Sequence, residues 1–388
     1  MSGSTTYDVF TPREATGAPS QAGITEDAPL GARVDVGTLV QNLWPQDEND
    51  IQAYAILDGQ WVPELYARLM EAGLPFCSLL DGPATQVRVT QAPYLVRLHR
   101  GDAFALDLLT RGWGQGWGIY FQASASAVRA ARPDVSSERV ERKLANGTLQ
   151  ASSDLVGDEP MMALRHHFRR FTRVAYPDGR VVAFRFYDPA VLGVWLQAAN
   201  VRETDAFFGP VRLFLYEDFH ELPSLNRPQL MRISYRSGSS AVTKFYDAAS
   251  ERSGILKKPP NAAGEVEALR APSGHLRLRA ETKKAFAARE LETFKETISI
   301  DVIAARYDSG LATDNRVVRR FVSDAVDEAR REGLRTRKEL SLYVLCSMRH
   351  GASFSDRHGK SLREAREEGR AEGFLAELTR RPPEHQGA

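Results

Sequence analysis

Two aspartates follow short apolar runs, where a carboxylate could act as a general acid or base. Asp58 follows the run at 54–57 and Asp81 follows the run at 76–80; each is succeeded by glycine, Gly59 in the first case. Strand ends are where α/β enzymes carry reacting groups, but Asp-Gly is also an ordinary turn pair. Because no second catalytic group stands at a matching spacing, we interpret Asp58, Gly59 and Asp81 as structural. An enzyme of unknown class that uses these strand-end aspartates is one alternative.

Histidine and cysteine spacing does not indicate a metal centre. His166 and His167 are adjacent, so their side chains diverge on a helix or strand. Cys77 and Cys346 lie far apart in apolar runs, and the sequence has no H-E-x-x-H, C-x-x-C or H-x-H spacing. We therefore predict no catalytic residue, no metal, no cofactor and two buried free thiols.

A glycine-rich stretch, Gly-Trp-Gly-Gln-Gly-Trp-Gly at 112–118, invites comparison with phosphate-binding loops. Its spacing is not G-x-G-x-x-G, and the run that follows it is typical of a strand, whereas phosphate binding uses a helix N-terminus. We interpret the stretch as a tight turn in which Trp113 and Trp117 pack. If Trp113 were exposed, it would be a candidate for contact with a partner.

A basic and aromatic segment at 164–171 reads Leu-Arg-His-His-Phe-Arg-Arg-Phe. Its arginines, with Arg173 beyond them, could neutralise phosphates, so a nucleic-acid-binding protein using residues 165–173 is a second alternative. Its apolar residues, however, recur at helical spacing, and the chain has a net charge of only +1. Arg169 and Arg170 could instead pair with an acidic protein surface, because the guanidinium fork matches a carboxylate.

Arg185 lies in the aromatic run Phe-Arg-Phe-Tyr-Asp-Pro at 184–189. A buried arginine needs a partner, and Asp188, three residues later, is the candidate. The pair Asp188-Pro189 also predicts the N-cap and first turn of a helix. We interpret Arg185, Tyr187, Asp188 and Pro189 as a strand-to-helix corner.

The elements around these residues predict an α/β N-terminal lobe with a mixed sheet flanked by helices, plus a mainly α-helical C-terminal lobe. A strand, a helix opened by Pro63 and closed by Gly73, and a second strand follow in the order of a βαβ unit. Later, a Pro-Asp-Gly turn at 177–179 joins two strand-like runs. The helical stripes after 281 include a capping box that starts at Thr336. The predicted organisation is a flexible leader at 1–48, an α/β domain at 49–220 with an insertion at about 133–160, a linker or irregular region with possible strands at 221–280, and a helical lobe at 281–388.

Length and composition set limits on the class of protein. A chain of 388 residues has room for two or three domains, and 43% hydrophobic and 26% charged residues are usual for globular proteins. The first residues are rich in Ser, Thr, Gly and Pro without an apolar signal core, and no apolar run reaches the roughly 20 residues of a membrane helix. We expect a cytoplasmic protein that binds neither membrane nor nucleic acid.

In chain order, several short pieces resemble a family of bacterial domains, originally of unknown function, that are encoded beside type VI secretion spike proteins. The pieces are YAILDG at 54–59, SLLDG at 78–82, APYLV at 92–96, WGIY at 117–120, LRHHFRRF at 164–171, PDGR at 177–180, FRFYDP at 184–189 and FFGP at 207–210, which contains the pair Phe207-Phe208. The resemblance covers somewhat under half of the chain.

This resemblance implies a non-enzymatic effector adaptor, or chaperone. Such a protein binds a secreted toxic effector in the cytoplasm and loads it onto the VgrG-type spike, so its partners are the effector and the spike. The α/β lobe would recognise one partner and the helical lobe would help to grip the other. Phe207 and Phe208, if exposed, join Arg169, Arg170 and Trp113 as candidate contacts. The chain departs from the family at 133–160 and at Ala190, where the family often has arginine.

Overall fold

The computed structural model describes residues 35–46, 50–131, 137–218, 230–237, 240–247, 252–256, 274–308, 314–351 and 354–381. The chain divides into two compact units, an α/β unit (Met1–Ala287) and a helical unit (Ala288–Ala388). The predicted class, an α/β lobe followed by a helical lobe, is confirmed. Of the predicted flexible leader at 1–48, residues 1–34 and 47–48 lie outside the described residues.

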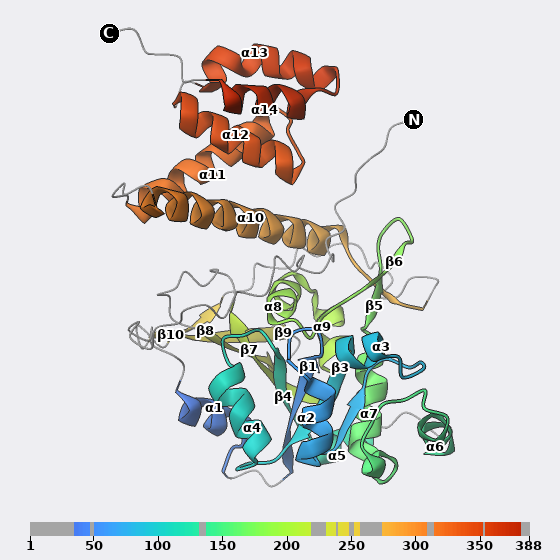
Figure 1. The fold of residues 1–388 in the computed structure, drawn as a ribbon. Coiled ribbons are helices and arrows are strands. Elements are labelled where there is room, and N and C mark those ends of the chain that lie inside the picture. The colour runs from blue at the N-terminus through green and yellow to red at the C-terminus, as the bar shows by residue number, and fades with distance from the viewer. Residues whose placement is uncertain are drawn as a thin grey trace. The chain divides into compact units, whose positions relative to one another are not determined.

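An eight-stranded sheet forms the centre of the α/β unit (Figure 1), with strand order β10-β9-β8-β7-β4-β1-β3-β2. Every neighbouring pair in it is antiparallel, and the mixed pairing is found in a small sheet of order β11-β5-β6, where β11 and β5 are parallel. The strands are β1 (Ile51–Asp58), β2 (Phe76–Ser78), β3 (Pro93–Leu98), β4 (Gly118–Ser124), β5 (Arg173–Ala175), β6 (Val181–Ala183), β7 (Val211–Asp218), β8 (Leu230–Ser237), β9 (Ser240–Asp247), β10 (Arg252–Leu256) and β11 (Leu276–Arg277).

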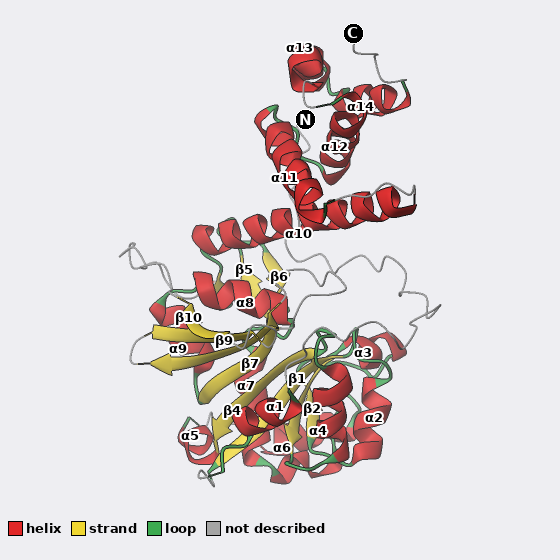
Figure 2. Cartoon of the chain, turned by 90° about the vertical axis from the view of Figure 1, so that its left-hand side faces the viewer, coloured by secondary structure: helices red, strands yellow, loops and turns green. Residues whose placement is uncertain are grey.

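Helices cover both faces of the large sheet (Figures 1 and 2). One face packs against α1 (Val36–Leu43), α2 (Leu65–Ala72), α4 (Ala103–Asp107) and the π-helical turn Leu108–Gly112, and α3 (Gln86–Gln91) lies before β3. The other face packs against α5 (Ala125–Ala130), α6 (Ser137–Ala145), α7 (Glu159–Arg169), α8 (Pro189–Ala198) and α9 (Val201–Phe208). Successive residues of β1 explain the two layers, because Tyr54 and Ile56 join the second core while Ala55 and Leu57 join the first.

The predicted βαβ unit has a strand inserted between its two strands. The helix ends before Gly73, as the sequence predicts, but it begins at Leu65, two residues after the predicted start at Pro63. Both β1 and β2 are antiparallel to β3, so they run in the same direction with β3 between them. The strand β3, which comes later in the chain, therefore lies between the two strands that α2 connects.

Residues 133–160, predicted as a surface insertion, contribute to the core from residue 137 onward. Val140, Leu149 and Leu155 are buried against the α7 side of the sheet. The backbone amide of Ser78 donates to the carbonyl of Gln150 at 2.8 Å, so this segment pairs with the edge strand β2. Residues 132–136 lie outside the described residues.

The predicted domain boundary at 220 does not match the division of the structure, which falls at 287/288. The two strands suspected at 230–235 and 241–246 are present as β8 and β9, and with β10 they extend the large sheet beyond β7. Residues 221–229 and 257–273 of the predicted linker lie outside the described residues. The sheet therefore takes its outer strands from a region that we expected to connect two domains.

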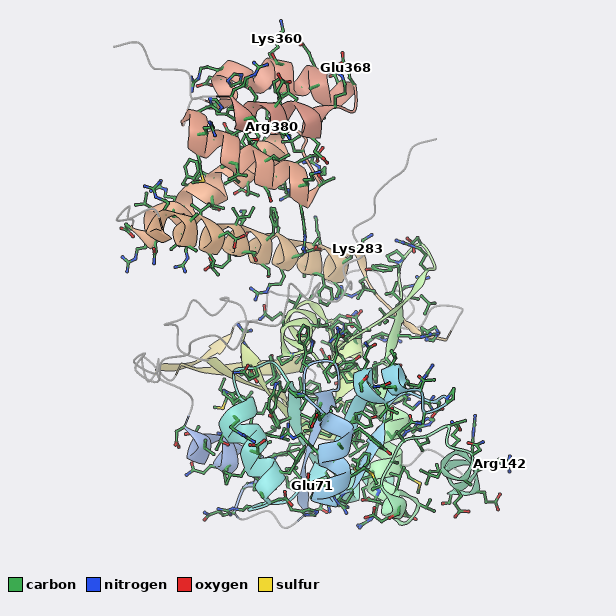
Figure 3. All side chains as sticks on the ribbon, in the orientation of Figure 1. Glu71, Arg142, Lys283, Lys360, Glu368 and Arg380 are labelled. Carbon is green, nitrogen blue, oxygen red and sulfur yellow. The ribbon has the colours of Figure 1, made fainter. Side chains whose placement is uncertain are left out.

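The helical unit has its own core. Its helices are most of α10 (Ala280–Asp308), α11 (Asn315–Arg331), α12 (Arg337–His350), α13 (Phe354–Glu367) and α14 (Ala371–Arg380). The predicted capping box is present, because Thr336 and Glu339 cap one another's backbone amides at the start of α12. Val326, Tyr343 and Leu375 are fully buried where α11, α12 and α14 meet, while Figure 3 shows Lys360 and Glu368 on the outside of the unit.

Candidate functional site: a buried corner and an arginine-lined groove

The first candidate site is the corner at the end of β1, where most of the residues singled out in the sequence meet. A carboxylate oxygen of Asp58 accepts from the guanidinium of Arg185, and the other accepts from the backbone amide of Gln60 at 3.0 Å. Asp58 is 1% exposed. Burial raises the pKa of Asp58 above its ordinary value, and the charge of Arg185 offsets only part of that effect.

The predicted partner of Arg185 was wrong. Arg185 pairs with Asp58 and donates to the Gln60 side chain at 2.6 Å, whereas Asp188 accepts from the Ala190 amide at 2.9 Å and caps α8. Asp188 thus acts as an N-cap, and Arg185 pairs with a carboxylate at the end of β1, far away in the sequence. The helix predicted at Pro189 is confirmed, and Arg185 follows the short strand β6 instead of lying inside it.

Backbone contacts fix the corner tightly. The amide of Asp58 donates to the carbonyl of Trp117 at 2.8 Å, and the amide of Gly59 donates to the carbonyl of Ala92 at 3.0 Å. A Cβ atom on Gly59 would lie 2.7 Å from the carbonyl oxygens of Thr90 and Ala92, so only glycine fits. The Asp-Gly pair is therefore a point of close backbone approach.

Glu217 is a buried acid beside this corner that the sequence analysis missed. It lies on β7, is 3% exposed, and accepts from the amide of Gly116 in the glycine-rich loop at 3.0 Å. Burial raises the pKa of Glu217 to about 8, although the amides of Gly116 and Gly114 oppose the shift. The loop thus encloses a carboxyl group and packs Trp113 on Tyr120, in keeping with a structural turn.

The second candidate site is an arginine-lined groove of about 860 Å³ within the α/β unit. Three segments form it: residues 79–92 around α3, the end of α7 with the start of β5, and residues 274–275 before β11. Four arginines and one acid are among its described lining residues, which include Asp81, Arg88, Arg169, Arg170, Arg173 and His275. Arg169 and Arg170, predicted as partner contacts, therefore share one concave surface.

Asp81 is held by three cations at the edge of the groove. Its carboxylate pairs with Lys143, with Arg165, and with Arg169 at 2.6 Å. Burial alone would raise the pKa of Asp81, but the hydrogen bond from Lys143 and the charge of Arg165 outweigh it, so the pKa lies below its ordinary value. Since Arg165 is 6% exposed and also donates to the Ser78 carbonyl at 2.8 Å, Asp81 anchors α7 to the end of β2.

Arg170 is positioned by a neutral histidine. Its Nη2 lies 2.9 Å from Nδ1 of His167, whose Nε2 lies 2.7 Å from the carbonyl oxygen of Phe207. Burial lowers the pKa of His167 to about 4, so the ring is neutral, donates from Nε2 and accepts from Arg170 at Nδ1. Gly209 (φ +49°) makes room for this ring, because a Cβ there would collide with it.

Three predicted partner contacts are wrong because their side chains are in the core. Trp113 is 3% exposed, and Phe207 and Phe208 are both 0% exposed. Phe207 packs on Trp195 with their ring centroids 4.7 Å apart, and Phe208 packs on Phe214 with their ring centroids 5.0 Å apart. These three large rings therefore lie in the core and are unavailable as binding hot spots.

The possible acid–base and metal groups do not converge. Asp58, Asp81 and His167 each engage a different set of partners. Within the described ranges, no three His, Cys, Asp or Glu side chains form a group suited to a metal ion. Cys77 and Cys346 are buried free thiols, and burial raises the pKa of each to about 12. Among the helices that the structure describes, none is long and apolar enough to cross a membrane.

The geometry defines an α/β unit that carries a basic groove, joined in sequence to a helical unit. A family model described as Domain of unknown function (DUF4123) matches residues 53–132 and 128–206 of this chain, which lie in the α/β unit. That family is associated with effector adaptors of the type VI secretion system. No curated protein and no solved structure is significantly similar to the chain.

Proposed function

We propose that the protein is a non-enzymatic adaptor that binds a secreted effector in the cytoplasm and loads it onto a VgrG-type spike. The match to the DUF4123 family over the α/β unit carries this proposal. The resemblance of the motif pieces points the same way, and two units with separate cores supply two surfaces for two partners.

The contacts of the strand-end aspartates support an adaptor over an enzyme. Asp58 is committed to Arg185 and Asp81 to three cations, so neither side chain is placed as a general base. Three family motif residues hold the backbone at the same corner. The amide of Gly59 donates to Ala92, the carbonyl of Trp117 accepts from Asp58, and the side chain of Asp188 caps α8. These residues therefore stabilise a scaffold.

Co-expression with the neighbouring toxin and spike genes tests the proposal. The tagged full-length chain should capture the toxin and the spike protein, each when expressed with it singly. Failure to capture either, with a folded chain, would contradict the adaptor function. Capture of DNA or RNA with a steep salt dependence would favour the nucleic-acid alternative instead.

Point substitutions, not a deletion, are needed to test which unit binds which partner. Deleting 281–388 would remove Phe286, which packs into the core of the α/β unit. The double variant Leu345→Gln/Met348→Gln changes two exposed residues of α12, and Arg173→Glu changes the groove. We expect each variant to lose one partner and keep the other; loss of both or of neither would contradict the division.

A further inference from the structure

We infer that the arginine-lined groove binds an extended acidic segment of a protein partner, with carboxylates paired to the arginines and aliphatic side chains packed on Leu80 and Val87. This inference rests on the proposed adaptor function for the identity of the partner. It follows from the charge and the lining residues of the groove.

Positive charge in the groove exceeds what its acid can balance. Asp81 already shares its two oxygens among Lys143, Arg165 and Arg169. Arg88 donates to the backbone carbonyl of Asp81 at 2.6 Å, a contact that leaves its charge unneutralised. Arg173 is exposed and has no ion-pair partner among the described residues. An anionic group entering the groove would find at least these two guanidinium groups.

The groove also carries apolar side chains. Leu80 is half-buried and Val87 on α3 is 63% exposed, whereas Leu79 and Ala92 behind them are already buried. A free phosphate or a sugar-phosphate backbone would gain nothing from Leu80 and Val87, whereas aliphatic residues of a peptide would bury these two side chains. Alternating acidic and aliphatic side chains match a surface that places guanidinium groups beside Leu and Val.

Single-stranded nucleic acid fits the groove less well. Proteins that hold it without sequence preference stack bases on aromatic side chains along a basic channel. The described lining residues of this groove include no Phe, Tyr or Trp. Guanidinium forks, in contrast, match carboxylates in two-point hydrogen bonds, which makes an acidic peptide the occupant that the lining favours.

Arg173→Glu is the cleanest change, because Arg169 and Arg170 are bonded to Asp81 and His167 and their loss would disturb the scaffold. Arg180→Glu is the matched control. Arg180 is an exposed arginine of the same β5–β6 hairpin that lies outside the groove lining and pairs with Asp178 at 2.9 Å. Both variants change the net charge of the chain by the same amount.

The test measures fluorescence anisotropy of labelled ten-residue peptides with the full-length chain. We expect a peptide of alternating Glu and Leu to bind at least about tenfold more tightly than one of alternating Gln and Leu. That preference should be lost in Arg173→Glu and kept in Arg180→Glu. Equal affinity for the two peptides, or equal effects of the two substitutions, would overturn the inference, as would tighter binding of a ten-nucleotide oligothymidylate or full competition by inorganic phosphate.

A second measurement separates this inference from the proposed function. If the toxin co-purifies equally with wild type and Arg173→Glu, the adaptor function stands and the groove inference fails. If the toxin never co-purifies with wild type, the adaptor function fails, and the peptide measurement still decides whether the groove prefers carboxylates.

Discussion

Asp58 and Asp81 have the same local sequence, an apolar run followed by Asp-Gly, yet they occupy different environments. The Asp58 side chain is 2% exposed and meets one arginine, and the Asp81 side chain is 23% exposed and meets three cations. The pKa of Asp58 is raised because burial dominates, and the pKa of Asp81 is lowered because its cations outweigh burial.

This difference distinguishes the corner at Asp58, which stabilises the fold, from the groove at Asp81, which exposes charged groups. At the Asp58 corner, a closed ion pair and close backbone contacts leave no room for a partner. At the groove, the acid fixes α7 and leaves exposed cations around it. An aspartate followed by glycine therefore marks the end of a strand. The residues packed around it determine whether that strand end carries exposed side chains that can bind a partner.

The largest expected effect comes from making the same substitution at both aspartates. Asp58→Asn leaves the buried charge of Arg185 without a carboxylate, and we expect it to lower the free energy of unfolding by about 3–5 kcal/mol. Asp81→Asn should cost about 1–3 kcal/mol, because its cations keep other partners and contact with water. Denaturant titration of the full chain measures both. Equal losses would show that the two environments do not differ energetically.

The next effect tests the support behind Arg170. Gly209→Ala forces a side chain onto the His167 ring at positive φ, and we expect a loss of about 3 kcal/mol or more. Gly179→Ala is the control, since Gly179 also has positive φ (+85°) but nothing lies near its Cβ position, and should cost about 1 kcal/mol. If the two variants unfold at the same denaturant concentration, the contact between Gly209 and His167 contributes nothing.

A pH-dependent effect distinguishes Glu217, beside the buried corner, from a surface acid. Its folded-state pKa of about 8 exceeds its ordinary value of 4.5, so the folded chain binds the extra proton between these pH values. The contribution of Glu217 to stability is thus full below pH 4.5 and is lost as the pH rises toward 8. Glu217→Gln should remove this downward slope, measured by unfolding at several pH values. Replacing the exposed Glu71 on α2 (Figure 3) by Gln should leave the slope as in wild type, and a slope unchanged in both variants would contradict the burial argument.

The smallest expected effect belongs to the groove rim. Arg173→Ala changes an exposed side chain, and we expect the free energy of unfolding to move by less than about 0.5 kcal/mol. Thermal or denaturant unfolding measures this change. A loss of several kcal/mol would assign Arg173 to the scaffold and remove the contrast between the two regions.

Much of the fold could be predicted from the sequence, because its signals are local. Alternating residues, the glycine after α2 and the Asp188 N-cap each act within a few positions of the chain. The region 221–280 was harder to interpret. Its strands were recognisable one by one, but membership of the sheet depends on pairing with β7, and the breakers around the strands suggested a linker.

The candidate site could be predicted only in part, because its partners come from distant positions. Arg185 meets Asp58 across 127 residues, and no local pattern reports such a pair. The groove combines α3, the end of α7 and residues 274–275, so Arg88 and His275 gave no signal on their own. Phe207 and Phe208 are contact candidates only if exposed, and an aromatic pair next to glycine does not reveal that both rings are buried.

The most direct test places stability and binding side by side for one variant from each region. For Asp58→Asn and Arg173→Glu, the free energy of unfolding and the affinity for the effector proposed as partner are measured on the same preparations. We expect Asp58→Asn to lose several kcal/mol of stability while its folded fraction binds as wild type, and Arg173→Glu to keep its stability and lose at least about tenfold in affinity. If both variants lose affinity only in proportion to the unfolded fraction, the groove is not a binding surface.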